Sequence, residues 1–415
     1  MTSIQSLAEL NELVQQVRQA AKSLEQAEQV SAALIDMAQA LAEASDVILE
    51  ANTLDLEASL EMAVPELVVE WLKLTPERLK TAITIVERLA HIDSVISFSC
   101  GAPVGTTSAS HGYLLGEPLG VIAFVYEALP ELAIVAAGLC LRTGNGLILK
   151  GGHEASQTNQ AIAQVFERVL VKTVLPERTI LALSPSDGEA ARRWLMQTPE
   201  LDLVIPYGRA SLVQQVVEEA NSPSLSTAIG NCYLYWAHTA PADVVARIVI
   251  DSHQGMPEPV NGIEKILVDE RVSTAAVQDL RQRLQASNLA LKEFTAPPLG
   301  TTVVAETDMW QEAQLNHAVM MCRVFDLATA IAIINRYSHG HTDCIVTNSY
   351  QESVQFASQV RSATIYVNAS PRFRRNAAQA NEIALGMSAQ RWLKGGRITL
   401  DALLTHKTVV KGVTP

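Results

Sequence analysis

The chain has 415 residues, of which 48% are apolar and 18% are charged, and its formal net charge is −13. A chain of this length exceeds the core of one ordinary domain, so we expect two or three domains. The acidic balance argues against a nucleic-acid-binding face, and no apolar run is long enough to predict a membrane-spanning helix.

The first part of the chain predicts helices followed by an irregular or narrow β segment. Apolar residues recur at helical spacing through residues 5–50. A further helix is predicted to begin after Thr75, because a proline and a glutamate follow it. Residues 97–118 are small, polar and glycine-containing, which favours irregular chain or a narrow β-arm.

From residue 118 onward, short apolar runs alternate with helical patterns. This alternation is typical of parallel sheets covered by helices on both faces. The stretch PSLSTAIGN, residues 223–231, lies between two such series and predicts a hinge. The runs are PLGVIAFVYE, GLILK, TILALS, LDLVIP, CYLYWA, KILVD, TTVVAE, DCIVTN and ATIYVN.

One stretch, LILKGGHEA at 147–155, has the order of a strand, two glycines and a helix. Backbone amides and a helix start can contact a phosphate there, although a glycine pair after a strand is more often a simple turn. The run RFRR at 372–375 could likewise hold a phosphate, but such a cluster is usually a solvated face.

Neither the histidines nor the cysteines predict a metal site. The two histidines of HGHT, 339–342, have no cysteine or glutamate close in sequence to complete a zinc site. The cysteines are scattered and form no CxxC pair, so no disulfide framework is expected. With no secretory signal at the N-terminus, we expect a cytoplasmic protein. The cysteines are Cys100, Cys140, Cys232, Cys322 and Cys344.

Several motifs in order resemble the gamma-glutamyl phosphate reductase family of the aldehyde dehydrogenase superfamily. The likeness runs from residue 48 to residue 412. It implies an aldehyde dehydrogenase-like α/β fold with two Rossmann-type parallel-sheet lobes and a small β-arm for oligomerisation. The motifs are EPLGVIAFVYEALP, LCLRTGNGLILKGGHEA, LDLVIP, INRYSHGHTDCIVT and YVNASPRF.

The resemblance also implies a domain plan. Residues 1–105 and 118–227 would form the cofactor-binding domain, and residues 228–370 would form the catalytic-type domain. Residues 106–117 and 371–415 would form the oligomerisation arm and C-terminal segment. A homo-oligomer, dimer or tetramer, is therefore expected.

The family reaction is the NADPH-dependent reduction of gamma-glutamyl phosphate to glutamate-5-semialdehyde in proline biosynthesis. A cysteine thiolate attacks the acyl phosphate and forms a thioester, which hydride then releases as the aldehyde. The resemblance assigns cofactor contacts to Lys150, Gly151, Gly152 and Glu154, and we expect weak nucleotide binding. The choice between NADPH and NADH stays open.

The catalytic positions depart from the family pattern. Val260 stands where the family has its nucleophilic cysteine, just before Asn261. Leu129 stands at the family's arginine, Glu131 at the asparagine that helps to stabilise the oxyanion, and Ser226 at an acid used as general base. An acidic side chain at 131 would repel the developing negative charge.

Two hypotheses follow from these departures. The chain could be a reductase that uses an unrecognised nucleophile or direct hydride transfer. It could instead be a divergent paralogue that lacks the cysteine and acts as a binding or scaffolding protein. Cys232 is the nearest substitute thiol, but ordinary family members also carry a cysteine there, which favours a packing role. A glycine-rich stretch of the family is replaced by glycine-free residues 374–384.

Overall fold

The structure, a computed structural model, describes residues 1–24, 27–92, 98–99, 110–254, 257–299, 308–390 and 395–412. It divides the chain into two compact units. The first unit comprises Met1–Leu225, Arg375–Leu385 and Ile398–Pro415, and the second comprises Ser226–Arg374 and Gly386–Arg397. The expected C-terminal segment 371–415 is thus shared between the two units.

The first unit is built on a four-stranded parallel sheet with the strand order β5-β4-β3-β6. All residues of these strands are buried, because helices cover the sheet. Residues of α1, α8 and α9 pack on one face, and α6 contacts the central strands as well. The strands are β3 (Val121–Tyr126), β4 (Gly146–Gly151), β5 (Ile180–Ala182) and β6 (Leu203–Tyr207).

The helices of this unit follow the predicted helical patterns, with breaks that the apolar spacing did not locate. The region predicted as helical at 5–50 contains α1, α2 and the first part of α3. Thr75 begins α5 as predicted, and its hydroxyl accepts a hydrogen bond from the Arg78 amide at 3.3 Å. The helices are α1 (Leu7–Ala21), α2 (Ala27–Glu43), α3 (Ser45–Glu61), α4 (Glu66–Leu72), α5 (Pro76–Ala90), α6 (Glu131–Arg142), α7 (Ser156–Lys172), α8 (Gly188–Gln197) and α9 (Ala210–Glu219).

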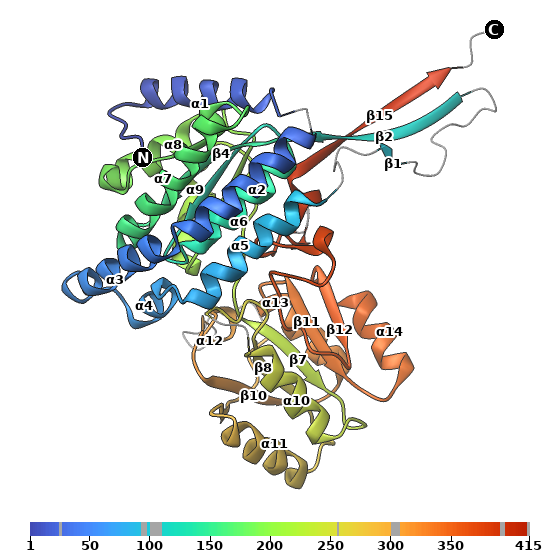
Figure 1. Cartoon of the computed structure of the whole chain (residues 1–415). Helices are drawn as coiled ribbons and strands as arrows, with labels where there is room; N and C mark the ends of the chain where they lie inside the picture. The colour runs from blue at the N-terminus through green and yellow to red at the C-terminus, as the bar shows by residue number, and fades with distance from the viewer. Residues whose placement is uncertain are drawn as a thin grey trace. The chain divides into compact units, whose positions relative to one another are not determined.

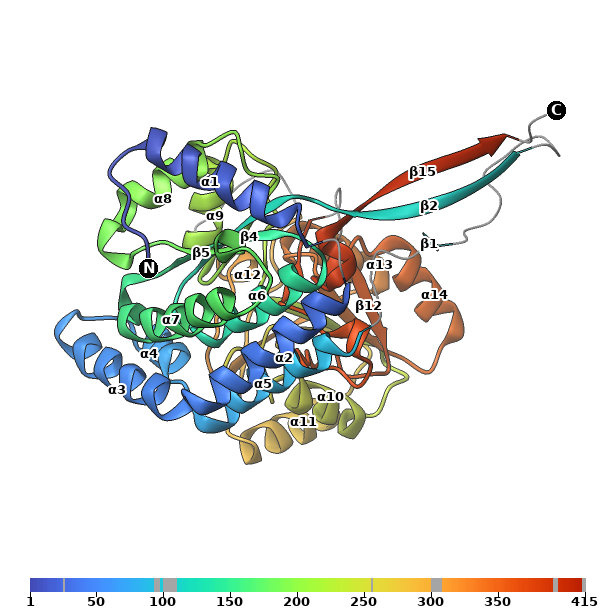
Figure 2. The ribbon, with the colours of Figure 1, turned by 45° about the horizontal axis from the view of Figure 1, so that its top comes forward.

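A long ribbon of two antiparallel strands extends beyond the helices of the same unit (Figures 1 and 2). Strand β2 (Ser110–Pro118) pairs with β15 (Leu404–Gly412) along its whole length, and β1 (Phe98–Ser99) pairs with the other side of β2. A narrow β-arm is one of the two structures that the sequence predicts for this region, and residues 110–118 form it. The rest of the predicted arm, residues 106–109, lies outside the described residues.

The second unit contains a six-stranded, fully parallel sheet with the order β12-β11-β7-β8-β10-β9. Two parallel sheets in one chain confirm the predicted fold class. The strands are β7 (Cys232–Trp236), β8 (Ile263–Asp269), β9 (Ala290–Glu293), β10 (Ala318–Val324), β11 (Thr342–Val346) and β12 (Thr364–Val367). The helices are α10 (Ala242–Ser252), α11 (Thr274–Ala286), α12 (Asp308–Gln311), α13 (Leu327–Tyr337) and α14 (Tyr350–Gln359).

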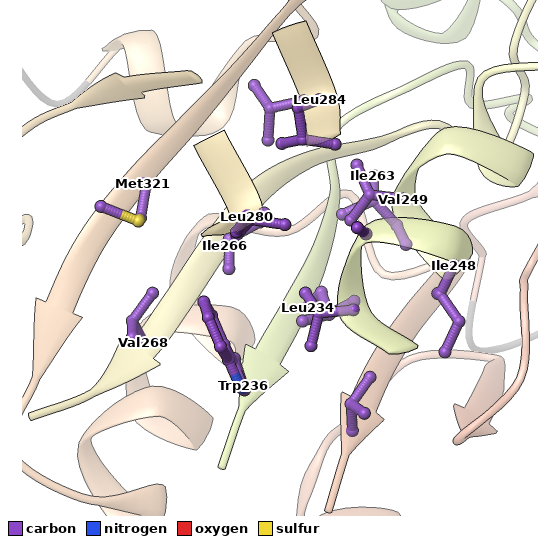
Figure 3. Close-up of a cluster of buried hydrophobic side chains, with 14 of the residues drawn as sticks. Leu234, Trp236, Ile248, Val249, Ile263, Ile266, Val268, Leu280, Leu284 and Met321 are labelled. Atoms are coloured by element: carbon purple, nitrogen blue, oxygen red, sulfur yellow. The ribbon is translucent and has the colours of Figure 1, made fainter. Parts of the chain in front are cut away.

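Each face of the second sheet carries its own apolar core. On one face, side chains of β7, β8 and β10 meet α10 and α11, as Figure 3 shows for Trp236, Leu280 and Met321. On the other face, Met320 joins residues of α13 and α14. The two adjacent methionines therefore serve as core residues on opposite faces.

None of the helices in the described parts of the chain has the length and hydropathy needed to cross a membrane. The same residues contain no group of three or more histidine, cysteine, aspartate or glutamate side chains placed to hold a metal ion.

Gly120, just before β3, generates a stability prediction. Its φ is +130°, and a Cβ atom there would overlap Asp202 Oδ2, which accepts from the Val121 amide at 2.7 Å and pairs with Arg18 at 2.8 Å. We expect Gly120→Ala to lower the free energy of unfolding by about 3 kcal/mol, measured by urea denaturation. Gly188→Ala is the control, because Gly188 has a φ of +56° but open space around it, so it should cost less, about 1–2 kcal/mol of backbone strain alone. Equal losses would contradict the proposed overlap.

Candidate functional site

A cavity of about 220 Å³ lies at the carboxyl ends of β3 and β4 in the first unit. This is the edge of a parallel sheet at which α/β proteins commonly bind ligands, since the loops and helix starts meet there. The cavity contains the four residues for which the resemblance implied cofactor contacts. The lining residues are Val125, Tyr126, Glu127, Lys150, Gly151, Gly152, His153, Glu154, Pro185, Gly188, Glu189, Arg192 and Leu212.

Lys150 and Glu154 present opposite charges to this cavity. The Lys150 ammonium donates to the Gly151 carbonyl at 3.2 Å, and burial lowers the pKa of Lys150. Glu154 Oε1 accepts from the Ala128 amide at 2.6 Å, while burial raises the pKa of Glu154. Glu154 therefore fixes the turn after β3 as well as lining the cavity.

Gly151, the last residue of β4, and Gly152, which follows it, are required by close packing. A Cβ atom on Gly151 would overlap Asn159 Nδ2, and one on Gly152 would overlap the Glu154 carboxylate. Side chains larger than hydrogen would therefore displace groups that build the cavity wall.

The start of α7, which follows these glycines, is already occupied by a carboxylate. Asp55 of α3, only 3% exposed, accepts from the amides of Gln157 and Thr158 at 3.0 and 2.8 Å. The Thr158 hydroxyl donates to it as well, at 2.6 Å. Because these helix-start amides are satisfied, an anion at this sheet edge would depend on cationic side chains instead.

The turn between β3 and α6 holds Leu129, one of the residues at which the sequence departs from the family. Ala128 and Leu129 have φ values of +51° and +41°, an uncommon conformation for residues other than glycine. Leu129 is fully buried, so the position assigned to an arginine contributes an apolar contact.

Glu131, at the start of α6, is buried against Arg78 of α5. Its Oε1 accepts from Arg78 Nε at 2.9 Å and from Nη2 at 2.5 Å, and the side chains are only 7% and 13% exposed. The inference that an acidic side chain at 131 would repel a developing negative charge stays a prediction, and the structure adds that this carboxylate is ion-paired. The partner is Arg78, which lies 53 residues away in the chain and which no local motif indicated.

Val260 and Asn261 lie in the second unit, just before β8. Val260 is 1% exposed, and its carbonyl accepts from the Gly230 amide at 2.9 Å and from His341 Nε2 at 3.0 Å. Asn261 Nδ2 donates to the Pro371 carbonyl at 2.8 Å, and Asn261 Oδ1 accepts from the Thr342 hydroxyl at 3.3 Å. The backbone at the predicted nucleophile position is thus held from several sides.

Cys232 lies beside this position, with its Sγ 3.3 Å from His341 Nε2. Because Nε2 donates its proton to the Val260 carbonyl, it cannot also accept the proton of the thiol. Burial raises the pKa of Cys232 well above its ordinary value and lowers the pKa of His341 to about 3. The pair is a neutral thiol beside a neutral imidazole, and reactivity requires a thiolate.

The remaining thiols of the described chain have similar surroundings. Cys140, Cys322 and Cys344 are buried, and burial raises the pKa of each. Cys100 lies outside the described residues.

The basic run at 372–375 is engaged with the protein itself. Arg372 donates to Asp251 at 3.2 Å and to Gln254 at 3.0 Å. Arg375 donates to the Leu385 carbonyl at 3.2 Å and to the Tyr207 hydroxyl at 3.0 Å. These contacts support a structural role for both arginines.

The predicted site residues are distributed between the two units. Leu129, Glu131 and the cofactor set around Lys150 belong to the first unit, whereas Val260, Asn261 and Ser226 belong to the second. The Ser226 carbonyl accepts from the Ala389 amide at 3.2 Å. The sequence did not single out Arg78, Arg192 or the contact between His341 and Val260, and only HGHT drew attention to His341.

Comparisons with known proteins place these observations in a family context. No family model matches the chain. It is 40% identical over 385 residues to "Gamma-glutamyl phosphate reductase 2" of Synechocystis sp., an overlap of 92% of this chain and 91% of that protein. The crystal structure of gamma-glutamyl phosphate reductase from Thermotoga maritima matches with a TM-score of 0.85 at 28% identity, over 97% of this chain and 98% of that one. An acetylating aldehyde dehydrogenase from Geobacillus thermoglucosidasius shares the fold, with a TM-score of 0.69 at 15% identity over 99% and 97% of the chains.

His341 generates a pH prediction. Its pKa falls from 6.5 in the unfolded chain to about 3 in the fold, so the unfolded state takes up the proton first as pH falls. Stability from the neutral ring is full above pH 6.5 and is lost below it, by about 1.4 kcal/mol per pH unit. We expect the free energy of unfolding of His341→Gln to depend less on pH between 6.5 and about 5 than that of the unsubstituted protein. Replacing the exposed His91 by Gln should leave the slope unchanged, and an unchanged slope in His341→Gln would contradict the assignment.

Proposed function

The chain belongs to the gamma-glutamyl phosphate reductase family, and we propose that it binds a nicotinamide dinucleotide without catalysing the thioester reduction of gamma-glutamyl phosphate. The observation that carries the proposal is Val260 at the position assigned to the nucleophile. An isopropyl side chain has no lone pair, so it cannot form the covalent bond to the acyl carbon.

The surroundings of the other thiols support the loss of this step. Cys232 would have to lose its proton in a fully buried site, where its neighbour His341 already donates to a carbonyl. Removal of a nucleophile from a covalent mechanism costs on the order of a millionfold in turnover, or about 8 kcal/mol. Asn261 alone does not replace that contribution.

The cavity at Lys150 supports nucleotide binding. It joins a buried ammonium, a carboxylate and two glycines at the carboxyl edge of a parallel sheet, the place where dinucleotides bind in related architectures. By family membership the expected nucleotide is NADP, and the chemistry it would supply is hydride transfer. Lys150 and Glu154 would orient it, and Gly151 and Gly152 would let it approach the backbone.

A reductase that transfers hydride directly is the second candidate. The similarity to a reductase covers 92% of the chain. In addition, the Glu131 carboxylate is ion-paired with Arg78, so its charge is compensated within the first unit. Turnover by the unsubstituted protein would favour this candidate over a binding role.

The first test compares the unsubstituted protein with Val260→Cys and with a triple variant that adds Glu131→Asn and Leu129→Arg. We expect no phosphate- and NADP-dependent oxidation of glutamate-5-semialdehyde from the unsubstituted protein or from Val260→Cys. The new thiol would be desolvated at a position only 1% exposed, so its pKa would be raised. A missing oxyanion donor would cost about a further 10²–10³ in turnover.

The controls separate a failed fold from a failed reaction. Glu131→Asn leaves Arg78 without its carboxylate, so the thermal unfolding of each variant is measured first. A family member with cysteine at the matching position verifies the assay. Robust turnover from Val260→Cys alone would mean that only the nucleophile had been lost. NADPH binding is followed by calorimetry in parallel, and no heat at millimolar nucleotide would reject the binding role.

The β-arm carries a separate prediction about assembly. A narrow ribbon of strands cannot bury its faces alone, and Val410 on β15 is 57% exposed. We propose that a second copy covers the arm, and light scattering should give a dimer or tetramer of the 44.9 kDa chain. Val410→Lys should shift this equilibrium toward the monomer, whereas Val171→Lys on α7, at a valine 64% exposed, should not. A stable monomer of the unsubstituted protein would contradict the proposal.

A further inference from the structure

Helix α3 turns mainly polar side chains inward and apolar side chains outward. An ordinary surface helix has the reverse arrangement, with its apolar stripe toward the core and its polar stripe toward water. Figures 1 and 2 show α3 at the outer edge of the first unit. Its buried residues are Ile48, Asn52, Asp55 and Ser59.

Hydrogen bonds from two of the buried polar residues fix the inner face of α3. Asn52 donates to the Leu72 carbonyl at 2.8 Å and accepts from the Leu74 amide at 2.9 Å. Asp55 accepts from the first amides of α7 at 3.0 and 2.8 Å. Because buried polar groups are satisfied on this face, the inner packing of α3 accounts for its polar side chains and leaves its outer apolar side chains unexplained.

The outer face of α3 carries apolar side chains at the spacing of a helix–helix interface. Val47 is 59% exposed, and Leu54, seven residues later, is 52% exposed. Ala51 is half-buried and Ala58 is exposed, so the four positions follow one another at intervals of four, three and four residues. Two packed helices interlock their side chains at these intervals. We call Val47, Ala51, Leu54 and Ala58 the outer stripe of α3.

The rim of the outer stripe, formed by Glu50 and Glu57, is acidic. Each glutamate lies three residues after an apolar member of the stripe, the position from which a charged side chain reaches a partner helix. Among the described residues, neither carboxylate forms an ion pair. Helix α3 contains no lysine or arginine. Its exposed acidic residues are Asp46, Glu50, Glu57 and Glu61.

The charge of the rim decides between possible partners. A second copy that packed its own α3 on this helix would bring the glutamates of both rims together, and like charges at these positions disfavour pairing. The same charges would be repelled by an anionic membrane surface. A helix with lysine or arginine beside its own apolar stripe would complement both the outer stripe and the rim.

We propose that the outer stripe of α3 docks a basic amphipathic helix of another protein. Apolar side chains of that helix would cover Val47 and Leu54, and its lysine or arginine side chains would pair with Glu50 and Glu57. A helix of 17 residues is about 25 Å long, so the contact is small and the complex is weak and transient. This docking does not depend on nucleotide binding.

The probe is a synthetic helical peptide of three heptads with leucine at positions a and d and lysine at positions e and g. Repulsion between its lysines disfavours pairing of the peptide with itself. A second peptide has glutamate in place of each lysine. Fluorescence anisotropy of the labelled peptides with the full-length protein at physiological salt should give a Kd of roughly 10–100 µM for the lysine peptide and no saturable binding of the glutamate peptide.

The first variant pair tests the outer stripe. Val47→Gln combined with Leu54→Gln removes the apolar contacts and should weaken binding of the lysine peptide at least about tenfold. Val354→Gln on α14 is the control, because this valine is 48% exposed and lies in another helix, and it should leave binding unchanged.

The second variant pair tests the rim. Glu50→Lys combined with Glu57→Lys should weaken binding of the lysine peptide at least about tenfold and create binding of the glutamate peptide. Glu12→Lys combined with Glu218→Lys is the control, because it changes the net charge equally at exposed positions of α1 and α9, and it should change neither. Thermal unfolding of each variant identifies any pair that does not fold, and the other pair then carries the test.

Three results would overturn the inference. Absence of saturable binding of the lysine peptide by the unsubstituted protein would reject the docking surface. Equal weakening by the charge reversals on α3 and by those on α1 and α9 would assign the binding to the net charge of the chain. A smaller assembly of the Val47→Gln, Leu54→Gln variant in light scattering would place the outer stripe between copies of this chain.

Discussion

Burial of parallel strands on both faces is the constraint on which the rest of this molecule depends. Strands such as β3 and β8 are inaccessible along their whole length, so polar chemistry can occur only where the strands end. In the first unit the carboxyl ends of β3 and β4 frame the cavity. In the second unit the residues before β8 hold Val260 and Asn261.

The same constraint requires buried charges to find partners. Glu131 meets Arg78, and Glu264 meets Lys265 at 3.1 Å, although both side chains of the second pair are at most 1% exposed. Losing one member of such a pair would leave an uncompensated charge in a medium of low polarisability. Arg192 is paired less closely, at 3.8 Å from Glu189 and 3.9 Å from Glu219, and its Nε has no hydrogen-bond partner among the described residues.

The family relationship covers nearly the whole chain, whereas the proposed loss of the thioester reaction depends on one position, Val260. The fold agrees with that of a gamma-glutamyl phosphate reductase of known structure over nearly the whole chain. Val260 is held by the Gly230 amide and His341, so the backbone around it is well ordered by contacts. A scaffold whose shape depends on apolar burial accommodates a valine at this position, because packing there needs volume and not sulfur.

The sequence by itself determined the α/β class, the start of α5 at Thr75, the division of the strands into two series and the residues that gather at Lys150. Those features are local, because the hydrophobic periodicity, the capping residues and the order of the motifs depend on residues close together in the sequence. The ion pair of Glu131 and the surroundings of Cys232 were decided only by the tertiary structure. Arg78 lies 53 residues from Glu131, and His341 lies 109 residues from Cys232, so neither pairing has a periodic or local signature. Arg192 was not predicted for the same reason. It lines the cavity at the strand ends, and a cavity exists only once distant segments have packed together.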